Sequence, residues 1–173
     1  MNFVNLIVTS YYVNKGGFML METLEKEQFI FANIFIISNR LKTACEKIQT
    51  DITMKQWLML AISSSTNEKK SLTQIGKLMG CSRQNIKKLA QPLENKGYIN
   101  FLRGNNNSVQ IVLTDKCYKY FETMNNSHLK TLNLLFRDFS DSDIQSFFVL
   151  LNKLESGLQE VEKYGDSINE YIL

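Results

Sequence analysis

Residues 82–88 read SRQNIKK, and six of these seven side chains suit hydrogen bonding with nucleic acid. The amides of Gln84 and Asn85 can pair bidentately with adenine, and a guanidinium or an ammonium group can pair with guanine. A hydroxyl at a helix start, together with the adjoining backbone amides, suits a phosphate. These types alone do not establish a function, but together with the helix-turn-helix, wing and local charge described below they predict contact with double-stranded DNA through Ser82, Arg83, Gln84, Asn85, Lys87 and Lys88.

The apolar residues of the same stretch predict the helix that would carry these side chains. Ile86, Leu89, Ala90 and Leu93 recur every three to four positions, which is the period of a helix with one buried face. A wheel of about 100° per residue places Gln84, Lys88 and Gln91 opposite that face. Arg83, Asn85 and Lys87 then lie on its flanks.

Pro92, the only proline of the chain, lies past the middle of this predicted helix. It cannot donate the hydrogen bond that would reach the carbonyl of Lys88. The disruption therefore falls after the first two turns, which hold the residues predicted to read DNA. We expect a bend between Lys88 and Pro92, separating this half of the helix from the LENKG half.

A second short helix is predicted immediately before the first. Ser71 and Gln74 have the spacing of a capping box, and Gly80 suits a left-handed stop. Ser82 can then cap the following helix, so the two form a helix-turn-helix with a tight turn. One apolar face of the earlier helix is expected to hold Leu72, Ile75, Leu78 and Met79.

After Gly97 the apolar period changes from 3.6 to 2. The segments YINFLR and SVQIVLT are typical of strands, and the GNNN between them is typical of a turn. This predicts a hairpin, or wing, in which Arg103, Asn105, Asn106 and Asn107 contact a minor groove or phosphates. Two alternatives remain open: the asparagines are simple turn residues, and Arg103 braces the wing.

Charge is concentrated around these elements. The chain carries a net charge of +3, whereas residues 67–104 hold eight lysines and arginines against two glutamates. That segment therefore sums to +6 and the remainder to −3. A basic middle between acidic flanks favours a polyanionic partner.

Long helices are predicted on both sides of residues 51–114. One extends from Thr23 to about Ile48, and a shorter one from Met54 to about Ser64; two more follow, beginning near Asp115 and Ser142. The first and last have apolar seams that alternate spacings of three and four, so each needs another helix. We expect a mainly α-helical fold in which residues 21–50 and 115–173 dimerise and residues 51–114 form a DNA-binding winged helix-turn-helix.

We assign residues 1–20 to a leader, a segment that precedes the folded domain and is expected not to belong to the native chain. Lys15, Gly16 and Gly17 precede Met19 and Met21, which is what a translated ribosome-binding site would give. Our hypothesis is that the native start is Met19 or Met21.

The order of elements resembles the MarR family of bacterial transcriptional regulators. The resemblance covers roughly residues 23–165 and rests on MKQWLMLAI, SLTQIGKLMGCSRQNIKKLAQPLENKGYI and VQIVLTDKCYKYFE. It implies a homodimer on a roughly palindromic operator, commonly a repressor, often released by a small ligand or by oxidation. The wing departs from the family, because RGNNNSVQ has no Asp-x-Arg at its tip.

The three cysteines have neither metal-ligand spacing nor a disulfide pattern, which favours a reducing cytoplasm. Cys81 precedes the reading helix, where the helix start and Arg83 would favour a redox-active thiolate; the alternative is a small buried turn residue. We expect Cys45 and Cys117 in the core. His128, the only histidine, has no second ligand at useful spacing, so we expect no metal.

Two other classes of function compete with the DNA-binding regulator. A winged-helix adaptor that binds protein instead of DNA would explain the uncharged wing tip. An enzyme fits poorly, because no nucleophile, phosphate loop or paired carboxylate stands out, and no cofactor motif or membrane span is recognisable. Trp57, Tyr118 and Tyr120 could line a cavity for a small-molecule effector or simply pack in the core.

Overall fold

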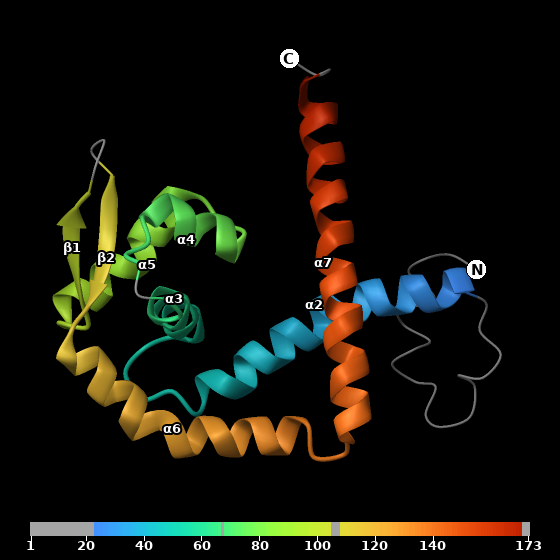
Figure 1. Cartoon of the computed structure of the whole chain (residues 1–173), viewed down its shortest axis with the longest axis horizontal. Coiled ribbons are helices and arrows are strands. Elements are labelled where there is room, and N and C mark those ends of the chain that lie inside the picture. The colour runs from blue at the N-terminus through green and yellow to red at the C-terminus, as the bar shows by residue number, and fades with distance from the viewer. Residues whose placement is uncertain (1–22, 67, 105–107, 171–173) are drawn as a thin grey trace. The chain divides into compact units, whose positions relative to one another are not determined.

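The helices and strands follow one another in the order expected for a winged helix-turn-helix with long flanking helices (Figure 1). The computed structural model describes residues 23–66, 68–104 and 108–170. The predicted leader and the wing-tip residues Asn105, Asn106 and Asn107 lie outside these ranges. The described elements are α2 (Thr23–Glu46), α3 (Met54–Ser64), α4 (Leu72–Met79), α5 (Arg83–Asn95), β1 (Ile99–Arg103), β2 (Val109–Leu113), α6 (Asp115–Leu135) and α7 (Asp141–Glu170).

The local signals around α4 act as the sequence predicts. The hydroxyl of Ser71 accepts a hydrogen bond from the backbone N–H of Gln74, and the Gln74 side chain accepts one from the N–H of Ser71. Gly80 ends the helix with a φ of 62°, which favours a residue without a Cβ. The predicted helix-turn-helix is therefore confirmed at both ends of its first helix.

The core of the winged region is built by α3, α4, α5 and the hairpin. Met59, Leu60, Ile86, Leu93 and Ile99 are fully buried. Each side chain of this size contributes about 1.5–3 kcal/mol when taken out of water. The predicted inward face of α5 is confirmed, with Leu89 half-buried at its edge.

One member of the predicted α4 face is wrong. Leu78 is 63% exposed, whereas Leu72, Ile75 and Gly76 are buried. On a wheel of about 100° per residue Leu78 lies about 120° from Leu72, so the buried arc passes through Gly76 instead.

Strands β1 and β2 pair antiparallel, with Phe101 opposite Ile111 and Arg103 opposite Val109. The segment directly before α4 also pairs with strand β2 through backbone contacts. The N–H of Ile111 donates to the carbonyl of Lys70 (3.1 Å), and Ser71 forms a bridge with Gln110. This contact ties the start of the helix-turn-helix to the wing, and the sequence analysis does not predict it.

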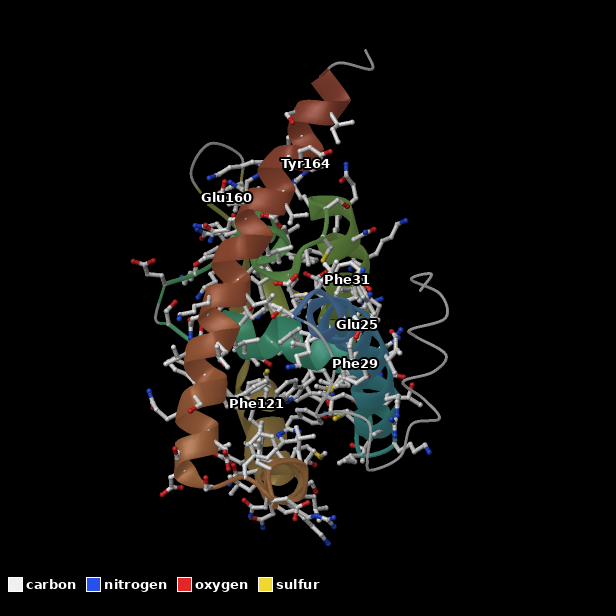
Figure 2. The ribbon with its side chains drawn as sticks, turned by 90° about the vertical axis from the view of Figure 1, so that its right-hand side faces the viewer. Glu25, Phe29, Phe31, Phe121, Glu160 and Tyr164 are labelled. Atoms are coloured by element: carbon white, nitrogen blue, oxygen red, sulfur yellow. The ribbon has the colours of Figure 1, made fainter. Side chains whose placement is uncertain are left out.

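The chain divides into two compact units after Thr123. The unit that follows consists of the end of α6 and the whole of α7. The predicted seam of α7 is exposed along its length, at Phe147, Leu151, Leu154, Leu158 and Val161. Figure 2 shows side chains that project from α7, among them Glu160 and Tyr164.

Helix α2 belongs to the first unit, and its seam is exposed as well. Ile30, Ile34, Ile37 and Leu41 are between 37% and 56% exposed. Phe31, labelled in Figure 2, packs edge-to-face on Phe35 at 5.2 Å between ring centroids. The helix ends at Glu46, and Lys47 and Ile48 continue in a tighter turn, so the predicted boundary is two residues too long.

Candidate nucleic-acid interface

Helix α5 begins where its sequence predicts, at a serine cap. The hydroxyl of Ser82 accepts a hydrogen bond of 3.3 Å from the backbone N–H of Asn85. This bond satisfies one of the amides that a helix start leaves without an intrahelical partner. Ser82 therefore anchors the first turn, which carries Arg83, Gln84 and Asn85.

The turn between α4 and α5 is held by backbone contact at Gly76. The N–H of Cys81 donates to the carbonyl of Gly76 (2.9 Å), and a Cβ on Gly76 would lie 2.5 Å from the carbonyl oxygen of Cys81. A side chain at position 76 would therefore force this turn to move. Sequence reasoning missed Gly76, although a glycine in the middle of a predicted helix is a signal of close approach.

The first two turns of α5 separate buried from exposed residues. Ile86 and Ala90 are fully buried. All six of the predicted contact residues are exposed: Ser82, Arg83, Gln84, Asn85, Lys87 and Lys88. The structure therefore brings these five hydrogen-bonding or cationic side-chain types to one exposed arc, as a groove-reading helix requires.

The last turn of α5 makes structural contacts. The Gln91 amide donates to Glu94 Oε2 (2.8 Å) and Asn95 Oδ1 (3.3 Å), and Glu94 Oε1 accepts from the N–H of Phe101 (3.4 Å). These bonds connect the end of α5 to β1. Helix α5 continues through Pro92 to Asn95, and the bend expected between Lys88 and Pro92 stays a prediction.

A buried amide on α3 also touches α5. Gln56 is 8% exposed and is the buried polar side chain of the described core. Its Nε2 donates to the carbonyl of Leu89 at 3.2 Å. Sequence reasoning did not single out Gln56, since its position after Thr53 explains it as a capping residue alone.

The described part of the wing ends at Arg103 and Gly104 and resumes at Ser108. The N–H of Gly104 donates to the carbonyl of Ser108 (2.9 Å), which closes the pair of strands. Arg103 is exposed at the end of β1. It therefore lies on the wing directly beside the tip, at the end of the strands away from α5.

A cluster of side chains braces the base of the wing, and we call it the junction cluster: Asp51, Lys96, Tyr98 and Lys116. Lys96 Nζ lies 3.0 Å from Asp51 Oδ1, and the Tyr98 hydroxyl donates to Asp51 Oδ2. Lys116 Nζ lies over the Tyr98 ring, 4.6 Å from its centroid. Hydrogen bonds from Tyr98 and Lys96 hold the pKa of Asp51 below its usual value, while burial and the Asp51 contact raise the pKa of Tyr98.

The three cysteines occupy different environments. Cys45 and Cys117 are buried, which confirms their predicted place in the core, and burial raises the pKa of Cys117 to about 11. Cys81 is half-buried, and its Sγ lies 3.6 Å from the carbonyl of Met79. Among the residues that the structure describes, no group of three potential metal ligands comes together.

The three aromatic residues suggested for an effector cavity differ in exposure, and Trp57 on α3 is half-buried. Tyr120 is buried, its ring packs edge-to-face on Tyr98 at 5.5 Å, and its hydroxyl donates to Gln49. Burial raises the pKa of Tyr120 to about 12. Tyr118, two residues earlier on α6, is 52% exposed, because residues two apart on a helix point in different directions.

An open apolar groove lies in the second unit. It has a volume of about 690 Å³ and is formed by the last turns of α6 and the first half of α7. Phe136, Phe147 and Leu151 are among the residues that line it, together with Arg137. None of the described helices is long and apolar enough to cross a membrane.

Comparison with known proteins identifies the fold. No family model matches the chain, and no curated protein matches its sequence. The structure is similar to that of a MarR/EmrR family transcriptional regulator from Acinetobacter sp. ADP1, with a TM-score of 0.70 and 20% identity over 78% of this chain and 97% of the other. The regulator BldR from Sulfolobus solfataricus gives a TM-score of 0.70 at 16% identity, covering 79% and 99% of the two chains.

A third similar structure contains nucleic acid. It is the complex of Staphylococcus aureus MepR with DNA, with a TM-score of 0.65 and 21% identity over 73% of this chain and 94% of the other. These likenesses confirm at the level of fold the resemblance that the sequence predicts. The chain has the winged helix-turn-helix fold of MarR-family regulators.

Proposed function

We propose that this chain, with its MarR-type winged helix-turn-helix, is a sequence-specific DNA-binding transcriptional regulator. It acts as a homodimer on a pseudo-palindromic operator, as a repressor, and carries out no enzymatic reaction. The observation that carries this proposal is the exposed polar arc on the first two turns of α5, backed by a fully buried face. The MepR structure, bound to DNA, supports it by analogy of fold.

The charge distribution supports DNA as the partner. Residues 67–104 carry a net charge of +6, and Arg83, Lys87 and Lys88 are exposed on α5. Cations that neutralise phosphates release counterions, which supplies the non-specific part of DNA affinity. Gln84 and Asn85 are the residues that we assign to base recognition, and Arg103 is assigned to the wing contact.

The two exposed seams support a homodimer. Large apolar residues are exposed along α2 and along α7, and an uncovered apolar surface of this length marks an interface. A two-fold dimer would present two copies of α5 to two half-sites of an operator. We place such a regulator in the cytoplasm. The simplest control is a small ligand whose binding releases the protein from its operator.

A salt titration tests DNA binding directly. The apparent affinity for double-stranded DNA should fall steeply with salt, with a logarithmic slope set by the number of phosphates neutralised. Footprinting on the DNA that flanks the protein's own gene should show protected sites about one helical turn apart. A flat salt dependence without sequence preference would favour the protein-binding adaptor instead. Loss of footprint on oxidation, prevented by Cys81→Ser, would support the thiol-based alternative.

A further inference from the structure

We propose that Gln56 is a positioning residue for DNA recognition: from the buried side of α5 it fixes the turns that present Gln84, Asn85, Lys87 and Lys88. This inference rests on the proposed DNA-binding function. Gln56 lies on α3 and is 8% exposed, so it does not itself reach DNA. It acts through the carbonyl of Leu89, which follows Lys88 directly in the chain.

The two ends of the Gln56 amide have different partners. Its Oε1 accepts a hydrogen bond of 2.9 Å from the backbone N–H of Thr53, which caps α3. Its Nε2 donates a hydrogen bond of 3.2 Å to the carbonyl of Leu89. One planar group therefore links the fixed start of α3 to the middle of α5, and rotation about its last torsion would break both bonds at once.

The place of this contact on α5 is informative. Pro92 has no N–H, so the carbonyl of Lys88 lacks its usual partner four residues ahead. A proline also weakens the helix around the preceding turn, where its ring crowds the backbone. The Gln56 bond reaches the next carbonyl, that of Leu89. The hydrogen bond from Gln56 thus lies next to the backbone hydrogen bond of α5 that Pro92 removes. This point separates the first two turns of α5 from its last turn, which bonds to β1.

Only an amide side chain at position 56 can both accept the bond from Thr53 and donate the bond to Leu89. A glutamate at position 56 would still accept the Thr53 bond, because glutamate is common at this place in a capping box. It could not donate to Leu89, and its carboxylate would face a carbonyl oxygen in a buried site. Gln74 is the matched control, because it makes the same capping box with Ser71 but is exposed.

The test compares Gln56→Glu with Gln74→Glu, which add the same charge and retain the same capping acceptor. The probe is a duplex carrying the site that the wild-type protein selects from a random double-stranded DNA library, with a scrambled duplex as reference. We expect Gln56→Glu to lower affinity for the selected site by about tenfold, as a lost buried hydrogen bond allows. Affinity for the scrambled duplex should change little, and Gln74→Glu should leave the ratio of the two affinities unchanged. If Gln56→Glu fails to fold, Gln56→Met and Gln74→Met replace the pair, because each removes the side-chain bond to the N–H of its cap residue and only the first also removes the Leu89 bond.

Two further readouts separate positioning from general stability. Backbone amide exchange without DNA should accelerate in residues 86–93 of Gln56→Glu and stay unchanged in residues 72–79. Adding Pro92→Ala, which restores the N–H toward Lys88, should reduce the loss of affinity caused by Gln56→Glu. Equal effects of Gln56→Glu and Gln74→Glu, with exchange unchanged in residues 86–93, would overturn the inference. Absence of any site preference in the wild-type protein would instead overturn the proposed function and leave the exchange result to decide on Gln56.

Discussion

The hydroxyl of Tyr98 lies 2.6 Å from Asp51 Oδ2 and donates a hydrogen bond to it. This bond connects the residue directly before β1 to the loop between α2 and α3. Lys96, two residues before Tyr98, pairs with the same carboxylate through its Nζ. The junction cluster therefore connects the segment between α5 and β1 to the loop between α2 and α3.

Removing the phenolic hydroxyl should weaken this frame in a pH-dependent way. The pKa of Asp51 is lower in the folded chain, so its contribution to stability is present above the unfolded pKa of about 4 and is lost as pH falls through the folded value. Tyr98→Phe should lower the free energy of unfolding by about 1 kcal/mol at neutral pH. Urea unfolding should show this difference shrinking in acid. Tyr118→Phe, at an exposed site, is the control, and a pH-independent loss in Tyr98→Phe would mean that Asp51 is not the relevant partner.

Adding one methyl group at Gly76 should disturb the turn before α5. The new Cβ would lie 2.5 Å from the Cys81 carbonyl oxygen, so the turn must move, at a cost of about 1–3 kcal/mol. Thermal unfolding should show a lower midpoint for Gly76→Ala. In Gly157→Ala the Cβ meets no atom within 4 Å, and helix propensity should keep or raise stability. A neutral Gly76→Ala would show that the turn is free to shift.

Base recognition and phosphate contact should respond to different substitutions. Gln84→Ala removes a bidentate amide from the exposed arc and should cost about 1–3 kcal/mol of discrimination at one base pair. Lys77, exposed on α4, is expected to act only through charge. Lys77→Ala should weaken binding evenly and reduce the salt slope by at most about one. Competition binding against single-base operator variants distinguishes the two, and equal sequence-independent losses would show that the reading face lies elsewhere.

The seam of α7 should carry the dimer. Leu154→Glu places a charge on an apolar seam residue that is 47% exposed in the single chain. Burying it in an interface would be costly, so sedimentation should show dissociation toward the monomer mass at micromolar protein. Ser156→Glu adds the same charge to the same helix away from the seam and should leave the dimer intact. Unchanged mass in both variants would exclude the α7 seam from the interface.

Periodicity and capping chemistry account for most of what the sequence predicted correctly. The buried face of α5, the capping box at Ser71 and the left-handed stop at Gly80 are local signals, and each is confirmed. The prediction that Leu78 is buried was wrong, because an apolar residue at the edge of the apolar face of a short helix can be either buried or exposed. The wing-tip asparagines lie outside the described residues, so their part in binding stays a prediction.

The features that sequence reasoning missed are tertiary. Gln56 looks like an ordinary capping residue until α3 packs on α5 and brings its amide to Leu89. The Asp51 carboxylate and the Tyr98 hydroxyl are far apart in the chain and meet only when the hairpin is in place. Such hydrogen bonds depend on how helices and strands pack on one another. The residue pattern within one helix or strand does not predict that packing.

The separation of α5 into an exposed arc and a buried face determines which of its residues can be substituted without loss of stability. Ile86, Ala90 and Leu93 hold the fold and are fully buried. The residues on the exposed arc can therefore be exchanged at little cost in stability: Arg83, Gln84, Asn85, Lys87 and Lys88. Under the proposed function, substitutions at these five surface positions would change the DNA sequence that is bound while the buried scaffold of α5 stays the same.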